Sequence, residues 1–355
     1  MNYTIALLAG DGIGPEVTAE AVKVSNAITQ KFGHSLNWRP ALTGAAAIDA
    51  VGDPYPAETH EVCASSDAVL FGAIGLPRFD NDPSAKVRPE QGLLRMRKQL
   101  GLFANVRPTF VFPSLIDKSP LKRERIEGTD LVFVRELTGG IYFGERGRQD
   151  GGETAFDTCT YTREEIKRLA RKGFELALSR RKQLCLVDKA NVLETSRLWR
   201  ETLQSMEAEY PEVKVTYELV DAVAMRLIQW PSAYDVLITE NLFGDILTDE
   251  ASVISGSMGL MPSASIGSEV ALYEPIHGSF PQATGKNIAN PLATILSAAM
   301  MFEMSFNLKE EAELIRSVVN QSLADGIVTE DLAESGKAYS TSAVGDYLVS
   351  LIEKA

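Results

Sequence analysis

Apolar residues along this chain follow two alternating patterns. Short apolar runs bounded by Gly, Asp or Asn are typical of buried strands, and longer segments with apolar residues at i, i+3, i+4 and i+7 are typical of helices. The runs predict strands at 3–9, 68–72, 131–134, 184–187, 215–220 and 236–239. The periodic segments predict helices at 16–31, 162–181, 292–306, 309–325 and 344–353. This alternation of strand and helix predicts the α/β class.

Three consecutive strands are each followed by a charged residue and then by a helix. Lys189 follows the strand at 184–187, Asp221 follows the strand at 215–220, and Asp245 comes shortly after 236–239. In α/β proteins, ligands bind beyond the carboxyl ends of the strands. Three such charges in succession therefore favour a functional site at this edge of the sheet.

The third of these segments carries a second acid. Gly244 follows a polar break, and the helical pattern begins behind it. Asp245 and Asp249 are four residues apart, so on a helix they share one face. Like charges at this spacing destabilise an isolated helix by about 0.2–0.5 kcal/mol. A divalent cation reverses the sign, because hard cations such as Mg²⁺ prefer carboxylate oxygens. The competing interpretation is a solvated acidic helix face.

The composition excludes several classes of protein. The 355 residues, 45% hydrophobic and 23% charged, are ordinary for a soluble enzyme of two domains or one large α/β unit. A net charge of −13 argues against nucleic acid or an anionic membrane as a partner. No apolar run approaches the ~18 residues that span a bilayer, and the N-terminus lacks the pattern of a signal peptide. Cys63, Cys159 and Cys185 are widely separated, so we expect no disulfide framework or zinc site and a reducing cytoplasm.

Glycine-rich segments mark further turns and loops. The turn at 10–16 (Gly-Asp-Gly-Ile-Gly-Pro-Glu) lacks the third glycine of GxGxxG and the later acidic strand end, so it is not a Rossmann fingerprint. Ile141 and Phe143 alternate among glycines, which predicts a strand pair or an extended arm. We expect segment 256–265 to be a loop at a domain boundary, and segment 274–291 to be an ordered functional loop.

One predicted helical stripe mixes residue types that seldom occur together. Glu90, Leu93, Leu94 and Arg97 fall at i, i+3, i+4 and i+7. A stripe that faces a core would not normally carry an arginine, and a stripe that faces solvent would not normally carry a leucine pair. The alternative for the leucines alone is ordinary core packing.

Together these segments are similar to the β-decarboxylating dehydrogenases, the family of isocitrate and isopropylmalate dehydrogenases. The resemblance covers essentially the whole chain, from the glycine turn at 10–16 to Ile-Ala-Asn-Pro291. Its most specific parts are the segment from Leu93 to Arg107, the sequence Val187-Asp-Lys-Ala-Asn-Val-Leu, and the sequence Glu240-Asn-Leu-Phe-Gly-Asp-Ile-Leu-Thr-Asp-Glu.

The resemblance implies an architecture. One discontinuous domain, residues 1–102 plus 256–355, would bind the cofactor, and residues 103–255 would bind substrate and metal and form the dimer. The central sheet would mix parallel and antiparallel strands and would not be a Rossmann fold. The active enzyme would be a cytoplasmic homodimer with shared active sites, to which Lys189 and Asp221 come from the partner subunit.

The resemblance also implies roles for individual residues. Tyr142 and Lys189 would be catalytic, Lys189 in removing the hydroxyl proton and Tyr142 in returning a proton to carbon. The metal, Mg²⁺ or Mn²⁺, would be bound by Asp221, Asp245 and Asp249. The substrate would contact Glu90, Leu93, Leu94, Arg97, Arg107, Arg135 and Asp221. The arginines would clamp its two carboxylates, since guanidinium groups form directional charge-assisted pairs.

The cofactor implied is NAD. The residues implied for its binding are Glu274, His277, Gly278, Ser279, Gln282 and Asn290. Gln282 departs from the family, whose NAD-dependent members usually carry an acid there that grips the ribose hydroxyls. Glutamine can hydrogen-bond those hydroxyls but does not repel a 2′-phosphate. Nothing basic stands beside it, so NAD remains the expected cofactor.

The leucine pair bears on the choice of substrate. Two leucines suit an isopropyl group, whose burial is worth roughly 1.5–3 kcal/mol. We therefore expect NAD-dependent oxidative decarboxylation of 3-isopropylmalate to 2-oxoisocaproate and CO₂, a step of leucine biosynthesis. The alternatives are a related dehydrogenase acting on D-malate, tartrate or homoisocitrate, and, more distantly, a non-redox Mg²⁺-dependent lyase.

Overall fold

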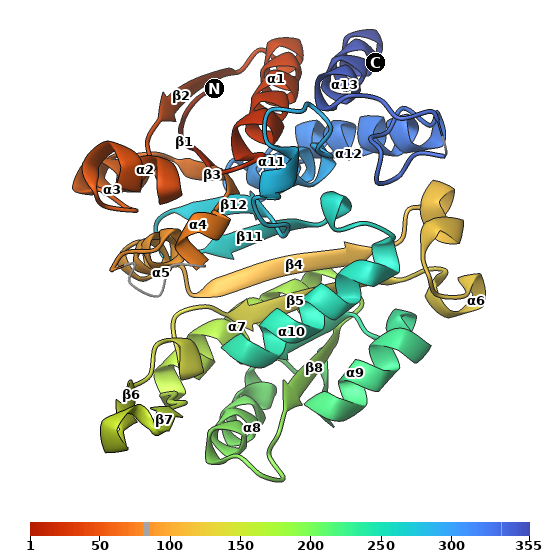
Figure 1. Ribbon diagram of the computed structural model, residues 1–355. Helices are drawn as coiled ribbons and strands as arrows, with labels where there is room; N and C mark the ends of the chain where they lie inside the picture. Colours follow the sequence, from red (N-terminus) through yellow and green to blue (C-terminus); the bar gives the residue numbers. More distant parts are fainter. Residues whose placement is uncertain (81–85, 335) are drawn as a thin grey trace. The chain divides into compact units, whose positions relative to one another are not determined.

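The computed structural model describes residues 1–80, 86–334 and 336–355 (Figure 1). The chain folds into two compact units. Unit 1 is Met1–Leu102 together with Gly256–Ala355, and unit 2 is Phe103–Ser255. Each unit has its own sheet region and its own covering helices.

Unit 1 contains five strands in the order β2-β1-β3-β12-β11. They are β1 (Asn2–Gly10), β2 (Ser35–Pro40), β3 (Ala68–Ala73), β11 (Pro262–Ile266) and β12 (Ala271–Pro275). β1 pairs in parallel with β2 and β3, and β12 pairs in parallel with β3 but antiparallel with β11. The strands are therefore of mixed direction, as the resemblance implied.

The described helices of unit 1 are α1 (Gly14–Phe32), α2 (Gly44–Val51), α3 (Ala57–Ala64), α4 (Pro77–Asp80), α5 (Pro89–Gln99), α11 (Leu292–Met304), α12 (Lys309–Ala324) and α13 (Thr341–Lys354). α1 packs against α11 and α13, and α11 packs against α12 and two strands, β11 and β12 (Figure 1). Every residue of α11 from Leu292 to Phe302 is buried. A helix covered on all sides can be apolar all round, which explains its composition.

Unit 2 also contains five strands, in the order β4-β5-β10-β8-β9. They are β4 (Ala104–Phe110), β5 (Asp130–Glu136), β8 (Gln183–Asp188), β9 (Lys214–Leu219) and β10 (Val236–Thr239). β4 is antiparallel to β5, and the other neighbours are parallel. The carboxyl ends of β5, β10, β8 and β9 therefore lie along one edge, where Arg135, Lys189 and Asp221 stand at or just beyond the strand ends.

The described helices of unit 2 are α6 (Arg123–Ile126), α7 (Arg163–Ser179), α8 (Glu194–Met206), α9 (Val220–Gln229) and α10 (Asn241–Ser252). Thr162 caps α7 through a capping box with Glu165. A separate antiparallel hairpin joins β6 (Arg146–Gln149) to β7 (Thr154–Asp157). The core of unit 2 includes Phe133, Leu237 and Leu247, from β5, β10 and α10.

Three local expectations were wrong. Residues Gly140–Tyr142 form a 3-10 turn, and the strand pair begins only at Arg146. Segment 256–265 is not a loop throughout, because Pro262–Ile266 is a strand. The helix that carries the two aspartates begins at Asn241 and not behind Gly244, because the Glu240 carboxylate caps the backbone N–H of Phe243 at 2.8 Å.

The placement of Gly244 inside α10 has a steric reason. A Cβ at this position would lie 2.3 Å from Thr239 Oγ1 and 2.6 Å from Arg135 Cγ. Glycine therefore lets the helix lie directly against the end of β5, so its sequence signal marks close packing rather than a helix start. In the described parts of the chain, no helix is both long and apolar enough to cross a membrane.

Candidate active site

In unit 2 the aspartates of α10 face arginines on two strands. Arg135, at the end of β5 and 2% exposed, pairs through Nη1 with Asp245 Oδ1. Its Nε and Nη2 donate to the backbone O and to Oδ1 of Asn241, at 2.9 and 2.8 Å. The guanidinium is thereby fixed in one orientation against α10, with one edge directed at a carboxylate.

The second arginine is held in a similar way. Arg107, on β4 and 7% exposed, donates from Nε to Asn105 Oδ1 at 2.6 Å and from Nη1 to Thr248 Oγ1 at 2.6 Å. Its Nη1 lies 3.7 Å from Asp249 Oδ1. The structure therefore brings Arg107, Arg135, Asp245 and Asp249 together, with each arginine facing one of the two aspartates.

Tyr142 belongs to the same cluster. Its hydroxyl donates to Asp245 Oδ2 at 2.8 Å, and its ring lies beneath the Arg135 guanidinium, 5.9 Å from centroid to Cζ. Burial and the hydrogen bond to the Asp245 carboxylate raise the pKa of Tyr142 to about 12. The phenol therefore keeps its proton at neutral pH and can act as a proton donor.

The two aspartates fit a hard cation by their chemistry. Burial raises the pKa of Asp249 above its ordinary value, Arg107 opposes this shift and the Asp245 carboxylate adds to it. A cation between the two carboxylates would replace that repulsion with attraction, and it would find the oxygen ligands that Mg²⁺ and Mn²⁺ prefer. Among the described residues, however, no group of three His, Cys, Asp or Glu side chains is placed to bind a metal.

The third expected ligand, Asp221, is engaged elsewhere in this chain. It lies in the first turn of α9, and its Oδ1 accepts a 2.8 Å hydrogen bond from Lys189 Nζ. That hydrogen bond lowers the pKa of Asp221. The structure thus forms a Lys189–Asp221 pair and a separate Asp245–Asp249 cluster.

The buried network that supports Tyr142 was not predicted from the sequence. Glu136, fully buried at the end of β5, accepts from the backbone N–H groups of Thr138 and Gly139 at 2.9 and 2.7 Å. The Tyr161 hydroxyl accepts from Asn241 N at 2.9 Å, and a Cβ on Gly140 would lie 2.2 Å from it. The available signal was an acid at a strand end followed by a glycine pair, which together fix the turn that carries Tyr142.

Unit 1 contributes the other predicted substrate residues through α5. Arg97 is 9% exposed and donates from Nη2 to Glu274 Oε1 at 3.1 Å. Its Nε is buried and has no hydrogen-bond partner in the described part of the chain. Leu93 packs partly against the core of the unit, whereas Leu94 is half-buried outside that cluster. Glu90 is exposed, with its carboxylate beside Gly75. Glu274, expected in the cofactor loop, is an ion-pair partner of Arg97.

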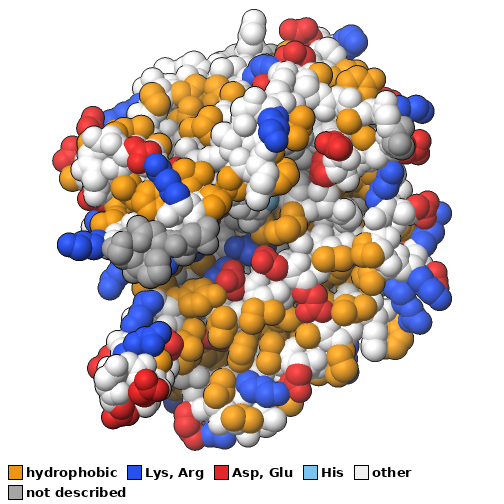
Figure 2. Space-filling view, in the orientation of Figure 1, with side chains coloured by type: hydrophobic (Ala, Val, Ile, Leu, Met, Phe, Trp, Pro, Cys, Tyr) orange, Lys and Arg blue, Asp and Glu red, His pale blue; other side chains and the backbone are white. Residues whose placement is uncertain are grey.

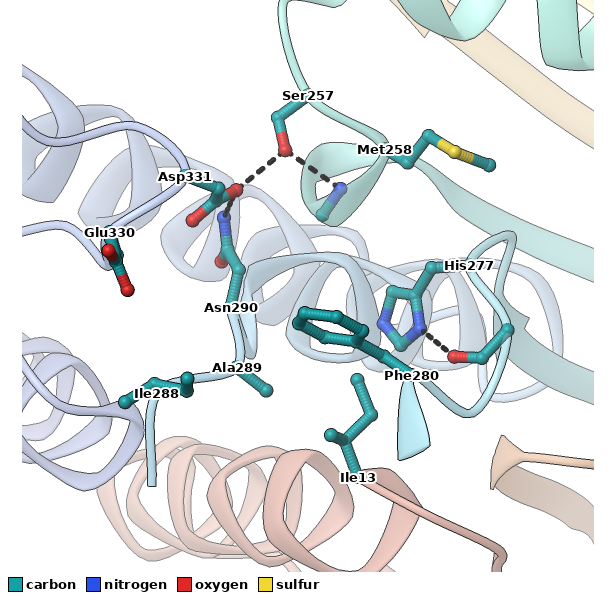
Figure 3. A pocket seen from close by; sticks show the side chains of 12 residues that line it. Ile13, Ser257, Met258, His277, Phe280, Ile288, Ala289, Asn290, Glu330 and Asp331 are labelled. Atoms are coloured by element: carbon teal, nitrogen blue, oxygen red, sulfur yellow. Dashed lines mark hydrogen bonds between the residues drawn. The ribbon is translucent and has the colours of Figure 1, made fainter. Parts of the chain in front are cut away.

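A cavity of about 550 Å³ in unit 1 lies beside the predicted cofactor loop (Figure 3). Of the predicted residues, His277, Gly278 and Asn290 line it. Glu274, Ser279 and Gln282 are not among its lining residues. Ser279 is buried and its carbonyl accepts the N–H of Ile13 at 2.9 Å, and Gln282 lies on the 3-10 turn Pro281–Ala283 with its side chain exposed.

His277 gives the cavity an unsatisfied polar atom. Its Nδ1 lies 3.0 Å from the carbonyl oxygen of Gly278, and its Nε2 is buried without a hydrogen-bond partner among the residues that the structure describes (Figure 3). Burial lowers the pKa of His277, so the ring is neutral at pH 7 and Nε2 is an acceptor when Nδ1 donates. A buried acceptor of this kind is costly unless something hydrogen-bonds to it, so it is a candidate contact for a ligand in the cavity.

Several lining residues were not foreseen. They are Ile13, Ser257, Met258, Gly259, Phe280, Ile288, Ala289, Glu330 and Asp331. Gly259 is required because a Cβ there would lie 2.8 Å from Asn290 Cβ. Ile13 belongs to the glycine turn, which was the one local signal for its position. Glu330 and Asp331 stand far along the chain from the loop, so only the fold brings them to the cavity.

Comparison with known proteins places these features in a family. The profile of the isocitrate/isopropylmalate dehydrogenase family matches residues 4–348. A 3-isopropylmalate dehydrogenase of Bacteroides fragilis (strain YCH46) is 57% identical over 356 residues, 100% of both chains. That of Halalkalibacterium halodurans is 52% identical, over 99% of this chain and 98% of the relative. The crystal structure of isocitrate dehydrogenase from Methylococcus capsulatus superposes with a TM-score of 0.89 at 33% identity, covering 99% of each chain.

These relatives match the chain along its whole length and include the elements that carry both the aspartate cluster and the cavity. The expected fold and the expected family are therefore confirmed. The chain belongs to the isocitrate/isopropylmalate dehydrogenase family of oxidoreductases.

Proposed function

We propose that this protein catalyses the NAD-dependent oxidative decarboxylation of 3-isopropylmalate to 2-oxoisocaproate (4-methyl-2-oxopentanoate) and CO₂, in leucine biosynthesis. The observation that carries the proposal is identity of 50–57% to relatives named 3-isopropylmalate dehydrogenase over nearly the whole chain. The cluster of two arginines, two aspartates and a protonated tyrosine in unit 2 supports it, because the two arginines suit the two carboxylates of a hydroxy diacid and the two aspartates suit a divalent cation.

The arginines bind the substrate carboxylates. Neutral side chains and a backbone carbonyl orient Arg107 and Arg135, and each guanidinium faces an aspartate. The buried Nε of Arg97 offers a further donor. Leu94 is half-buried outside the core cluster, so it is the member of the leucine pair best suited to contact an isopropyl group.

Two proton transfers complete the reaction, and the two residues that perform them come from different copies of the chain. Lys189 of the second copy removes the proton of the substrate hydroxyl, and its pairing with Asp221 of that same copy orients the side chain. Tyr142, which is protonated at neutral pH, donates a proton to carbon after CO₂ leaves. The Glu136 and Tyr161 network keeps the turn that carries Tyr142 in one conformation.

Two groups complete the chemistry. Asp245 and Asp249, with Asp221 of a second copy, would hold Mg²⁺ or Mn²⁺, which acidifies the hydroxyl and stabilises negative charge on its oxygen. The cavity of unit 1 would hold the adenosine part of NAD, the hydride acceptor, with Asn290 at the adenine and His277 Nε2 as an acceptor.

An exposed apolar stripe supports a homodimer with shared sites. Ile246 on α10 is 60% exposed and Val253, directly after its last residue, is 47% exposed; Met225 and Ile228 on α9 are 59% and 49% exposed. Figure 2 gives a view of the hydrophobic side chains over α10 and α9. α9 and α10 pack against each other, and Asp249 lies between Ile246 and Val253 at helical spacing. A second copy covering this stripe would bring its own Asp221 towards the acidic pair.

A substrate panel tests the proposal. We expect NADH to form with 3-isopropylmalate, NAD and Mg²⁺, at a kcat/KM at least about 10-fold above that for D-malate, tartrate, isocitrate and homoisocitrate. EDTA should abolish the reaction, and Mn²⁺ should restore it. A preference for unsubstituted malate would refute the substrate assignment. Turnover of 3-isopropylmalate without NADH formation would instead indicate a non-redox lyase.

A further inference from the structure

Among the described residues that line the cavity of unit 1, the charged side chains are all acidic. Its lining contains two carboxylates, those of Glu330 and Asp331, and among the described residues no lysine or arginine. The remaining lining is largely apolar, with Ile13, Phe280 and Ile288 around it (Figure 3). A ligand in this cavity therefore meets negative charge that no basic lining residue offsets.

The two carboxylates differ in their hydrogen-bond partners within the protein. Asp331 Oδ2 accepts from Ser257 Oγ at 2.6 Å and from Asn290 Nδ2 at 3.0 Å, and its Oδ1 accepts from Thr329 Oγ1 at 2.6 Å. Asn290 Oδ1 in turn accepts from Leu292 N at 3.0 Å. Asp331 is thus a positioning residue that fixes the Asn290 amide, and its charge is shared among three donors.

Glu330 has no such partners. It is exposed at the cavity and makes no hydrogen bond or ion pair with any residue that the structure describes. In Figure 3 the dashed lines join Asp331 to Ser257 and Asn290, and none reaches Glu330. Its charge is therefore available to act on whatever occupies the cavity.

The position that the family would use for this task carries no charge here. Gln282 is neutral, exposed and outside the cavity lining. A glutamine does not repel a phosphate, so any electrostatic exclusion of a 2′-phosphate from this cavity would have to come from another negative group. Among the described lining residues, Glu330 is the carboxylate without a hydrogen-bonding partner.

We propose that Glu330 is the residue that excludes a 2′-phosphorylated adenosine from this cavity and so makes the enzyme selective for NAD. The inference rests on the proposed cofactor role of the cavity. The 2′-phosphate of NADP carries up to two negative charges, and it would meet an unneutralised carboxylate and no basic side chain among the described lining residues. Because the carboxylate is exposed, this repulsion is screened by salt.

Two adenosine fragments isolate the effect from turnover. They are 5′-AMP and adenosine 2′,5′-bisphosphate, which differ only in the 2′-phosphate, and their dissociation constants are measured by calorimetry on the intact protein. We expect Glu330→Gln to lower the ratio of bisphosphate to AMP dissociation constants about 10-fold, or about 1.4 kcal/mol. Glu330→Lys should lower it further. High salt should lower the ratio in the wild type and leave it nearly constant in Glu330→Gln.

The control is Glu353→Gln, which removes the same charge from an exposed acid in α13 of the same unit and should leave the ratio unchanged. If both Glu330 variants bind 5′-AMP and keep the wild-type ratio of dissociation constants, the proposed role of Glu330 is overturned, while the assignment of the cavity stands. Failure of the wild type to bind 5′-AMP would overturn the cavity assignment as well. The substrate panel would still report independently on the reaction.

Discussion

The two candidate sites are built on opposite principles. On α10 in unit 2, each aspartate faces an arginine, and Tyr142 bonds to one of them, so charges already compensate one another. The cavity of unit 1 is mostly apolar, with an unsatisfied His277 Nε2 and a Glu330 carboxylate that has no partner among the described residues. We infer that the first site would recognise its ligand by exchanging charge partners, and the second by shape and a few polar atoms. We therefore expect substitutions in the aspartate cluster to change kcat, and substitutions around the cavity to change the preference for NAD over NADP.

The largest effect is expected for Lys189→Met in the charge-paired region. Loss of the amine removes the group that takes the hydroxyl proton, so kcat should fall by about 10³-fold or more. The free energy of unfolding should change by less than about 1 kcal/mol, because the Lys189–Asp221 pair is partly exposed. Steady-state kinetics and chemical denaturation measure the two effects.

Lys214→Met is the matched control for this substitution, since Lys214 is exposed in the same unit. It should leave kcat unchanged. A normal kcat in Lys189→Met, with the control also normal, would remove Lys189 from the mechanism.

The leucine pair is expected to affect selection rather than chemistry. Leu94→Ser should lower kcat/KM for 3-isopropylmalate relative to D-malate by about 10-fold, because a serine no longer buries the isopropyl group. Leu93→Ser should also destabilise the fold, since Leu93 packs against the core. The double variant should lose 3-isopropylmalate most strongly.

Leu42→Ser provides the control, because Leu42 is 48% exposed in the same unit. It should leave the substrate ratio unaltered. If Leu94→Ser also leaves the ratio of kcat/KM for 3-isopropylmalate and D-malate unchanged, Leu93 and Leu94 serve only in packing.

A smaller effect, on stability, is expected when the pH is lowered, and it comes from His277 beside the cavity. Burial lowers the pKa of His277 in the folded state, so below its unfolded pKa of about 6.5 the unfolded chain binds more protons than the folded one. Stability attributable to this residue is therefore full above that pH and falls as the pH drops below it. Denaturation of the wild type and of His277→Asn, between about pH 7.5 and 5, should show the steeper loss in the wild type. Equal slopes would contradict the buried neutral ring.

The smallest effect is expected for Gln282→Asp. The added charge should raise selectivity for NAD over NADP, but by only about 2-fold, because Gln282 lies outside the cavity lining and exposed charges are well screened. Comparison of kcat/KM with the two cofactors measures it. A change larger than that of Glu330→Gln would reverse the ranking of the two positions.

Local patterns predicted much of this molecule. Buried runs such as Val236–Thr239 and capped helices such as α7 depend on neighbouring residues alone, so their sequence is sufficient. The spacing of Asp245 and Asp249 likewise placed both on one face of α10. The arginines that compensate them were found only through the family resemblance, because β4 and β5 stand far from α10 in the sequence.

The failures have a common physical cause. Gly244 resembled a helix start but serves close packing against Arg135, and Pro262–Ile266 resembled a loop but pairs with β12. Glu330 carried no local signal, since its neighbours define neither a cavity nor a charge partner. In each case the deciding contact is made by residues distant in the sequence, which local periodicity does not encode.

We propose that one chain holds only part of the catalytic site and that a second copy completes it. Mixing two inactive variants, Lys189→Met and Asp245→Asn, under conditions of subunit exchange tests this proposal. Each heterodimer would contain one site with every group intact, so the mixture should recover about a quarter of wild-type activity. Absence of recovery, with heterodimers demonstrated by mass spectrometry, would contradict the shared site.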